Sequence, residues 1–222
     1  EREDSSGLTY QQVFLISVPQ DTIRRYQNIF KSAGLTLTAL EIESLSLARS
    51  VVGRDPTPTV IADIGRRSTA IAIIDAGGLK YAGQTDFAGS SLTQAIASSL
   101  SINPLRAEEL KRERGILATG PNYELSTIML PFLDGILSEV KRSITSYEAQ
   151  VPGAPKIERC ILSGGGANLL GIEKYFTSQL GIPAVKASPF DRFEYLASLE
   201  PMLPELNPEM SVALGLVLRE FT

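Results

Sequence analysis

Residues 59–87, TVIADIGRRSTAIAIIDAGGLKYAGQTDF, decide the fold of this chain, because short apolar runs alternate there with tight polar turns. The first run, residues 60–62, leads into Asp63 and Gly65, and a second run covers residues 70–74. Apolar runs of this length, bounded by glycine and small polar residues, are typical of β-strands. The stretch therefore predicts a strand, a polar turn and two further strands.

The turn after Asp63 has two interpretations. A carboxylate beside Gly65 and the hydroxyls of Ser68 and Thr69 suits a Mg²⁺–phosphate group, because glycine lets the backbone approach and the carboxylate can hold the water shell of the metal. Alternatively, this is an ordinary hairpin in which the aspartate and serine side chains cap the turn. Taken alone, these residues slightly favour the ordinary hairpin.

The composition limits the classes of protein to which the chain can belong. A chain of 222 residues that is 43% hydrophobic and 21% charged can bury a sizeable core, as one large domain or two small ones. A net charge of −4 without a Lys/Arg tract gives no reason to expect nucleic-acid binding. The chain has no histidine, which excludes histidine bases, triads and metal ligands. The single cysteine, Cys160, excludes an intrachain disulfide and fits a reducing compartment.

The beginning of the chain carries no targeting signal. No stretch reaches the roughly 18 apolar residues of a membrane span, and residues 1–7, EREDSSG, do not form a signal peptide. They lack a starting methionine and read like a hairpin loop. We expect the chain to be a fragment, cut at or near its N-terminus.

Strand and helix patterns alternate along most of the chain and predict an α/β fold with a mixed sheet. Further strands are expected at residues 12–19, 35–42, 157–163 and 183–187, and helices at 21–33, 41–52, 90–100, 105–114, 131–149, 171–180 and 208–221. A loop is expected around residues 120–122, and residues 188–206 are expected to be irregular with room for one short helix.

Two of the expected helices have patterns that need an interpretation. The helix at 105–114 is dense in charge, which by itself indicates a face exposed to solvent. The helix at 131–149 has one continuous apolar stripe that we assign to the core, namely Leu133, Ile136, Leu137, Val140, Ile144 and Tyr147.

A second glycine-rich turn follows the strand at 157–163. Residues 162–168 read LSGGGAN and lead into a helix, an arrangement that brings backbone close to a nucleotide. The run is neither a Walker A loop nor a GxGxxG motif, so on its own a tight structural turn is the commoner explanation. Together with the turn at Asp63, however, it favours nucleotide binding.

The order of these elements resembles the second half of the actin-like ATPases, whose fold is ribonuclease H-like. Within that superfamily the chain most resembles the PilM family of the type IV pilus inner-membrane platform, and FtsA is a near relative. The resemblance covers nearly the whole chain. It is carried by the runs LISVPQDTIRRYQNIFKSAGLTLTALEIESLSLAR, DIGRRSTAIAIIDAGGLKYAGQTDFAGSSLTQAIA, RCILSGGGANLLGIEKYFTSQLGIPAVKASPF and VALGLVLREF.

The resemblance implies a site for ATP or ADP with Mg²⁺. Asp63 would hold the metal through water, and the Gly65 amide with the Ser68 and Thr69 hydroxyls would face the β- and γ-phosphates. Glu43, in the first connecting helix, would polarise the attacking water. Equally, Glu43 is explained as a surface glutamate that the helix dipole favours.

The same resemblance places the nucleoside. Gly164, Gly165 and Gly166 would pass beneath the adenosine and the α-phosphate, and Asn168 would belong to the same cofactor-binding loop. In the charged helix, Glu108 would bond the ribose hydroxyls and Lys111 would lie along the adenine.

The chain also departs from the actin-like pattern. Nothing before Asp63 supplies the DxG motif of a first phosphate loop, which supports truncation and predicts poor nucleotide binding by this fragment alone. Ala88-Gly89 stands where many relatives have Gly-Gly. The first lobe is therefore expected to be incomplete.

The implied domain organisation follows the superfamily. We expect the remainder of an inserted small subdomain at residues 1–40, with a β-α-β order, and a connecting helix and linker at 41–58. The second lobe would cover residues 59–206 with a helical insertion near 101–120, and residues 207–222 would form a helix returning to the first lobe.

The resemblance implies a cytoplasmic nucleotide-binding scaffold of type IV pilus assembly with weak or no ATPase activity. It would lie at the inner face of the cytoplasmic membrane, which it reaches only indirectly, and bind other platform proteins and the N-terminal peptide of a PilN-type bitopic membrane protein. The alternatives are an FtsA-like division protein, an actin-like type II secretion protein, a sugar kinase and an α/β interaction module with vestigial glycine turns.

Overall fold

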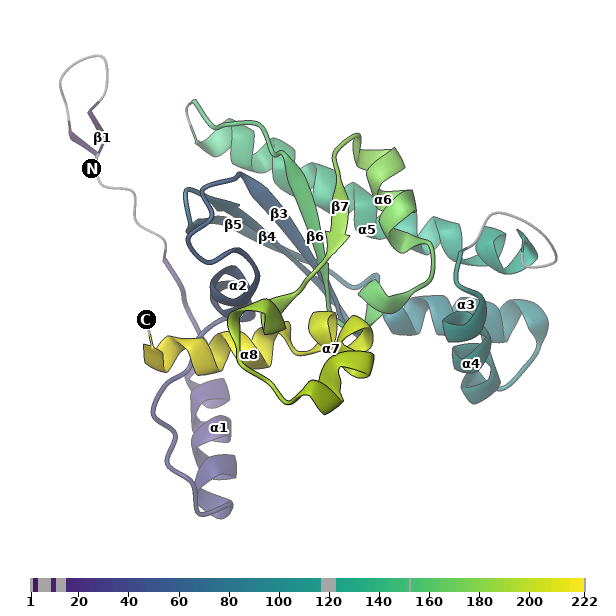
Figure 1. Ribbon diagram of the computed structural model, residues 1–222, viewed down its shortest axis with the longest axis horizontal. Coiled ribbons are helices and arrows are strands. Elements are labelled where there is room, and N and C mark those ends of the chain that lie inside the picture. Colours follow the sequence, from purple (N-terminus) through teal and green to yellow (C-terminus); the bar gives the residue numbers. More distant parts are fainter. Residues whose placement is uncertain (1, 4–8, 11–14, 117–122, 152, 222) are drawn as a thin grey trace. The chain divides into compact units, whose positions relative to one another are not determined.

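The computed structural model describes residues 2–3, 9–10, 15–116, 123–151 and 153–221, and it divides after Glu41 into two units (Figure 1). The expected loop at residues 120–122 lies outside the described residues. The domain boundaries expected from the sequence stay predictions.

In its described residues, the first unit contains one helix and one short antiparallel strand pairing. Strands β1 (Arg2–Glu3) and β2 (Thr9–Tyr10) pair antiparallel, and helix α1 (Gln20–Ser32) has no buried residue. As predicted, α1 ends next to Gly34, which has a φ of +71°, and the Leu35 amide donates to the Phe30 carbonyl at 2.9 Å.

The strands expected on either side of α1 are not formed in the described residues. Residues 12–14 lie outside the described chain, whereas residues 15–19 and 35–42 are described and adopt no strand. A strand forms only where its backbone can bond to a neighbouring strand, and no described residue pairs with either segment. The predicted β-α-β order of the first forty residues is therefore wrong in the part that the structure describes.

A five-stranded mixed sheet lies at the centre of the second unit, in the order β5-β4-β3-β6-β7. Its strands are β3 (Thr59–Ile64), β4 (Thr69–Asp75), β5 (Gly78–Thr85), β6 (Arg159–Ser163) and β7 (Ala184–Lys186). The first three form the predicted antiparallel meander, while β6 runs parallel to β3 and β7 runs parallel to β6. The predicted mixed sheet is confirmed.

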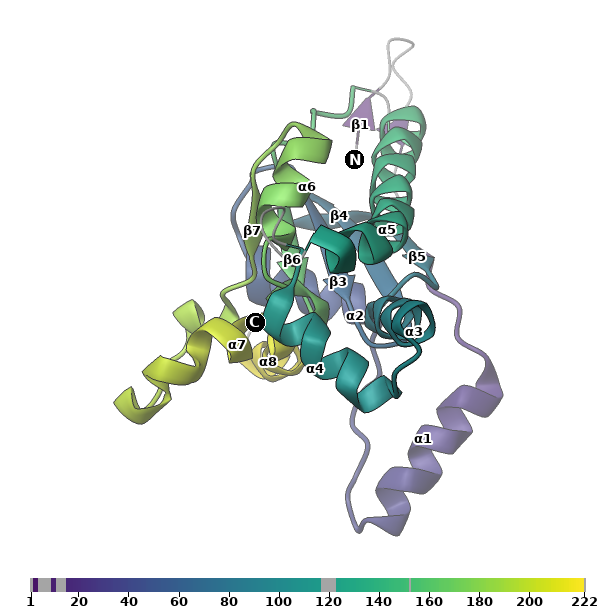
Figure 2. The same ribbon diagram turned by 90° about the vertical axis from the view of Figure 1, so that its right-hand side faces the viewer.

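Both faces of the sheet are covered, which explains why its strands are almost continuously apolar. Successive side chains point to opposite faces, so Val60, Ala62 and Ile64 join one core cluster while Ile61 joins the other. Helices α3 (Gly89–Leu100), α5 (Tyr123–Gln150) and α6 (Ile172–Leu180) contribute to the first cluster. Helix α2 (Glu43–Leu47), its π-helical continuation Ala48–Val52 and α8 (Ser211–Leu218) contribute to the second (Figures 1 and 2).

Helix α5 begins earlier than the sequence indicates. The sequence predicts a helix from about residue 131, but the helix begins at Tyr123 and contains Pro131 in its interior. Packing explains the difference: Met129 is fully buried, and Leu125 and Ile128 pack against the core. This burial offsets the roughly 3 kcal/mol that an interior proline costs a helix. The predicted stripe from Leu133 to Tyr147 lies in or against the core, as expected.

The C-terminal segment forms two helices where one was expected. After 3-10 turns at Pro189–Arg192 and Ala197–Met202, α7 (Leu203–Glu209) contains Pro208, and α8 starts at Ser211. In a continuous helix the Pro208 carbonyl would accept from the amide of residue 212. Here it accepts from the Gly164 amide at 2.8 Å and from the Ser163 hydroxyl at 3.2 Å, so the helix breaks at Met210.

Helices α2 and α8 approach each other closely on the second face of the sheet. The Ser46 hydroxyl donates to the Val212 carbonyl at 3.0 Å, and Arg49 Nη1 donates to the Gly215 carbonyl at 2.6 Å. A Cβ atom at Gly215 would collide with the Ser46 carbonyl, so the contact requires glycine. The small residue predicted there has its expected role, although Ala213 is exposed.

Among the described residues, no helix is both long enough and apolar enough to cross a bilayer.

Candidate functional site

The two turns singled out in the sequence meet at one edge of the sheet. Strands β3 and β6 are adjacent and parallel, and Asp63 is in register with Ser163. The segments that follow the two strands therefore leave the sheet at the same edge. In open α/β sheets, ligands bind outside the carboxyl ends of the strands. The residues that follow β3 and β6 are therefore the first place to look for a site.

Gly164 is required by the close approach of these two turns. Its φ is +77°, and a Cβ atom there would lie 2.6 Å from the Ile64 carbonyl oxygen and 2.9 Å from Asp63 Oδ1. A Cβ atom at Gly166 would collide with the Ile64 side chain. The glycine run thus brings the two turns into backbone contact, whatever ligand they bind.

The turn between β3 and β4 is fixed to the start of helix α3. The Gly65 amide donates to the Ser68 carbonyl at 3.0 Å, and the Gly89 amide donates to the Gly65 carbonyl at 3.0 Å. The Ser90 amide donates to the Arg66 carbonyl at 2.9 Å. The Thr69 hydroxyl, which is fully buried, donates to the Phe87 carbonyl at 2.7 Å, so it is engaged within the protein.

Asp63 is the titratable group at the centre of this edge. Burial raises the pKa of its carboxyl, the Ser163 hydroxyl opposes that shift, and the charge of Glu43 adds to it. Glu43 is exposed in the first turn of α2. The structure therefore brings these two predicted residues close enough for their charges to interact.

A cavity of about 820 Å³ opens beside this edge, between α3, α4 (Pro104–Arg114), the 3-10 turn Gly165–Asn168 and α7. Six predicted site residues line it: Gly65, Glu108, Lys111, Gly165, Gly166 and Asn168. Asp63, Ser68, Thr69, Gly164 and Glu43 are not among its lining residues. The structure thus brings five of the six predicted nucleoside residues together in one cavity, whereas Gly164 and the predicted metal residue Asp63 are not part of its lining.

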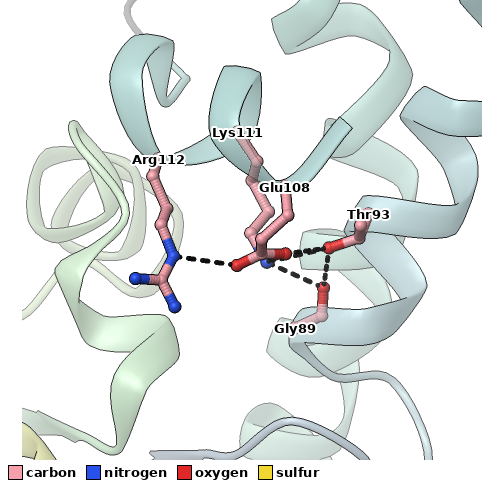
Figure 3. Close-up of polar contacts among 5 residues, drawn as sticks. All are labelled: Gly89, Thr93, Glu108, Lys111 and Arg112. Atoms are coloured by element: carbon pink, nitrogen blue, oxygen red, sulfur yellow. Dashed lines mark hydrogen bonds and ion pairs between the residues drawn. The ribbon is translucent and has the colours of Figure 1, made fainter. Parts of the chain in front are cut away.

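A charged network forms the wall of the cavity at α3 and α4 (Figure 3). Lys111 Nζ lies 2.7 Å from Glu108 Oε2 and also donates to Thr93 Oγ1 and the Gly89 carbonyl. Thr93 Oγ1 lies 2.5 Å from the same Glu108 oxygen, and Arg112 Nε donates to Glu108 Oε1 at 3.0 Å. Burial acts to raise the pKa of Glu108, but the bonds from Lys111, Thr93 and Arg112 outweigh it and lower the pKa to about 2.

Several residues of the cavity were not predicted. Arg112 follows Lys111 and shares the helix face of Glu108 at the i, i+4 position, so the spacing could have identified it. Glu205 and Glu209 of α7 also line the cavity, and Asn168 Nδ2 donates to the Glu205 carbonyl at 2.9 Å. No local pattern marks these two glutamates, because only the tertiary contact of α7 with the glycine turn places them there.

The side chains available as ligands show whether the site around Asp63 suits Mg²⁺. In the part of the chain that the structure describes, no three carboxylate or cysteine side chains gather as a metal cluster. Mg²⁺ is commonly held by one or two carboxylates together with phosphate oxygens and water. Asp63, with its unfavourable burial and its neighbour Glu43, fits such a metal when phosphates supply further ligands.

The network predicts a pH dependence of stability. The pKa of Glu108 falls from 4.5 to about 2 on folding, so its stabilising contribution is complete above pH 4.5 and disappears as the pH falls toward 2. We expect Glu108→Gln to lower the urea midpoint at pH 7 and to differ less from the wild type as the pH approaches 2. Glu109→Gln is the matched control, because Glu109 is an exposed neighbour bonded to Arg106. Equal pH profiles for the two variants would contradict the prediction.

Comparison with known proteins identifies the family. A family model described as type IV pilus assembly protein PilM matches residues 4–221. A solved PilM-PilN type IV pilus biogenesis complex contains a chain that is 26% identical, with a TM-score of 0.72, covering 90% of this chain and 58% of that one.

Two more distant structures share the fold. The ethanolamine utilization protein EutJ from Carboxydothermus hydrogenoformans is 21% identical, with a TM-score of 0.65, covering 91% of this chain and 62% of that one. MreB5 of Spiroplasma citri bound to ADP is 20% identical, with a TM-score of 0.68, covering 92% and 66%. The predicted actin-like fold is confirmed, and the chain spans about three fifths of the length of these structures.

Proposed function

Because this chain belongs to the PilM family of type IV pilus assembly proteins, we propose that it serves as a nucleotide-binding scaffold of the pilus machinery. The cavity beside β3 and β6 is the observation that carries the proposal. Its volume of about 820 Å³ lies within the range of roughly 300–1,000 Å³ that small-molecule sites occupy.

We assign the nucleoside to the α4 side of the cavity. Glu108 and Lys111 would contact the ribose and the adenine, and Gly164, Gly165, Gly166 and Asn168 would support the nucleoside and the α-phosphate. The support for this assignment is that five of these six residues line one cavity. A related fold, that of MreB5, has been solved with bound ADP.

The phosphates would lie toward the β3–β4 turn. Gly65 would face them from the cavity wall and Ser68 from the turn, while Thr69 would act through the turn because its hydroxyl donates to the Phe87 carbonyl. Asp63 would hold Mg²⁺ through water, and the metal would neutralise the phosphate charge. Binding of a cation would also relieve the unfavourable burial of the Asp63 carboxylate.

The site suits a ligand-controlled scaffold more than a fast enzyme. Glu43 is the only catalytic group that we propose, and it is exposed at the start of α2. ATP would then act by favouring a closed arrangement of two lobes, with weak or no turnover, because a ligand shifts an equilibrium toward the state it binds better.

The partner that we propose is the N-terminal cytoplasmic peptide of a PilN-type bitopic membrane protein. The support is that the solved PilM chain similar to this one comes from a PilM-PilN complex. The protein would then be cytoplasmic and peripheral, held at the inner face of the membrane through this peptide and through other platform proteins.

Capture on an immobilised peptide tests this function. We expect the full-length protein to be retained by the N-terminal peptide of the PilN-type protein from the same organism, and not by a scrambled peptide. Retention should change about fivefold or more between Mg-ATP and nucleotide-free buffer, which is the lower range of allosteric coupling. If the peptide does not retain the protein, the proposed partner is wrong. If retention is the same with and without Mg-ATP, the proposed role of the nucleotide is wrong.

A further inference from the structure

Four basic residues line the cavity, and three of them are already bonded within the protein. Lys111 and Arg112 contact Glu108 at 2.7 and 3.0 Å, and Lys186 Nζ donates to Asn168 Oδ1 at 3.3 Å. The fourth, Arg66, is exposed, and the described part of the chain shows no ion pair or hydrogen bond of its guanidinium. Arg66 therefore has an uncommitted positive charge at the cavity wall.

Four backbone amides near this end of the cavity are also engaged. The Gly65, Gly89 and Ser90 amides donate to carbonyls of the turn between β3 and β4, and the Gly164 amide donates to the Pro208 carbonyl. These are the donors that a glycine-rich phosphate loop would otherwise offer. Since these four amides are engaged, the Arg66 guanidinium is a donor that remains available to an anion at this end of the cavity.

The backbone of Arg66 is fixed while its side chain is exposed. Its carbonyl accepts from the Ser90 amide at 2.9 Å, which ties the turn to α3. Glu205 and Glu209 of α7 also line the cavity and add negative charge to its lining. Phosphates are repelled by these carboxylates and attracted to Arg66, which favours their placement at Arg66.

We propose that Arg66 binds the terminal phosphates of a nucleoside polyphosphate and thereby sets the preference of the site for triphosphate and diphosphate over the nucleoside. The proposal rests on the proposed nucleotide-binding function. A guanidinium offers two parallel N–H donors to phosphate oxygens, and these charge-assisted bonds are stronger than neutral ones. Arg67, the next residue, does not line the cavity and provides a matched control.

Calorimetric titration of the full-length protein tests the assignment. ATP, ADP and adenosine are titrated into the wild type, Arg66→Gln and Arg67→Gln, with Mg²⁺ and with EDTA. We expect Arg66→Gln to weaken the binding of ATP and ADP about tenfold, as for the loss of one charge-assisted bond. The binding of adenosine should weaken less than about twofold. Arg67→Gln should remain within twofold of the wild type for all three ligands, and Arg66→Lys should recover part of the loss.

The outcomes separate this inference from the function on which it rests. If the wild type binds ATP and Arg66→Gln equals Arg67→Gln, the assignment of Arg66 is overturned and nucleotide binding stands. An equal loss for adenosine and ATP also overturns it, because the variant has then damaged the cavity and not the phosphate contact. If the folded wild type binds none of the three ligands, the nucleotide function itself is wrong.

Discussion

Replacement of Asp63 by asparagine is expected to weaken Mg-ATP binding by the full-length protein about tenfold or more, since one charged contact to the metal's water shell is lost. The same variant should be at least as stable as the wild type without ligand. Burial raises the pKa of the Asp63 carboxyl, so the charged form is less favourable in the folded chain than in the unfolded one. Asparagine keeps the size and the acceptor oxygen but carries no charge.

The sign of the pH dependence follows from this raised pKa. Between the unfolded and the folded pKa, the folded state binds more protons, so the stability of the wild type decreases as the pH rises through that interval. The stability of Asp63→Asn relative to the wild type should therefore increase from acid toward neutral pH. Urea denaturation at several pH values measures this effect, and calorimetry with Mg-ATP measures the affinity.

An exposed aspartate of the same unit serves as the control. Asp86 lies in the loop before α3, and Asp86→Asn should alter neither the stability profile nor the affinity for Mg-ATP. If Asp63→Asn binds Mg-ATP as tightly as the wild type, Asp63 does not hold the metal. That result would favour the alternative of an interaction module with vestigial glycine turns. If Asp63→Asn is less stable than the wild type at neutral pH, the Asp63 carboxylate stabilises the folded state, which contradicts the raised pKa.

Substitution of Gly164 by alanine is expected to have the largest effect on folding. Its φ of +77° and ψ of 168° lie in a region that essentially only glycine adopts, and they cost a residue with a Cβ about 1–3 kcal/mol. The new Cβ would also lie 2.6 Å from the Ile64 carbonyl oxygen, so β3 and β6 would have to separate where they meet. We expect a total loss of about 3–5 kcal/mol, which is in the range of severe core substitutions.

Gly181 provides a control for a positive φ without a close neighbour. It has a φ of +70° and a ψ of 13°, a left-handed conformation milder than that of Gly164, and no atom lies within 4 Å of a Cβ built there. Gly181→Ala should therefore show only the backbone strain, about 1–2 kcal/mol. The urea midpoints of the two variants give the difference directly. If they are equal, the close approach of the two turns does not constrain the fold.

The sequence was sufficient for the parts of the fold that depend on local patterns. The meander at residues 59–87, the strand before the glycine run, the charged helix and the core stripe of α5 all lie where periodicity and turn residues placed them. These elements agree at every level, because local propensity, apolar pattern and burial favour the same structure.

The elements that the sequence predicted wrongly have a common cause: tertiary contacts determined the structure where the local sequence allowed more than one. Pro131 lies inside α5 because Met129 and its neighbours are buried, and Pro208 lies inside α7 because its carbonyl is bonded to the glycine turn. Residues 35–42 have a strand pattern but no described partner strand. Likewise, Glu205 and Glu209 reach the cavity only through the packing of α7, which no short-range signal encodes.

The carbonyl oxygen of Pro208 gives the second unit a mechanical property. It accepts from the Gly164 amide, the Ser163 hydroxyl and the Ser211 hydroxyl, so the glycine turn and the first residue of α8 share one anchor point. Helix α8 is in turn held to α2 through Ser46 and to the π-helical continuation of α2 through Arg49. We therefore expect a ligand that displaces the glycine turn to shift α8 and, through its contacts, α2.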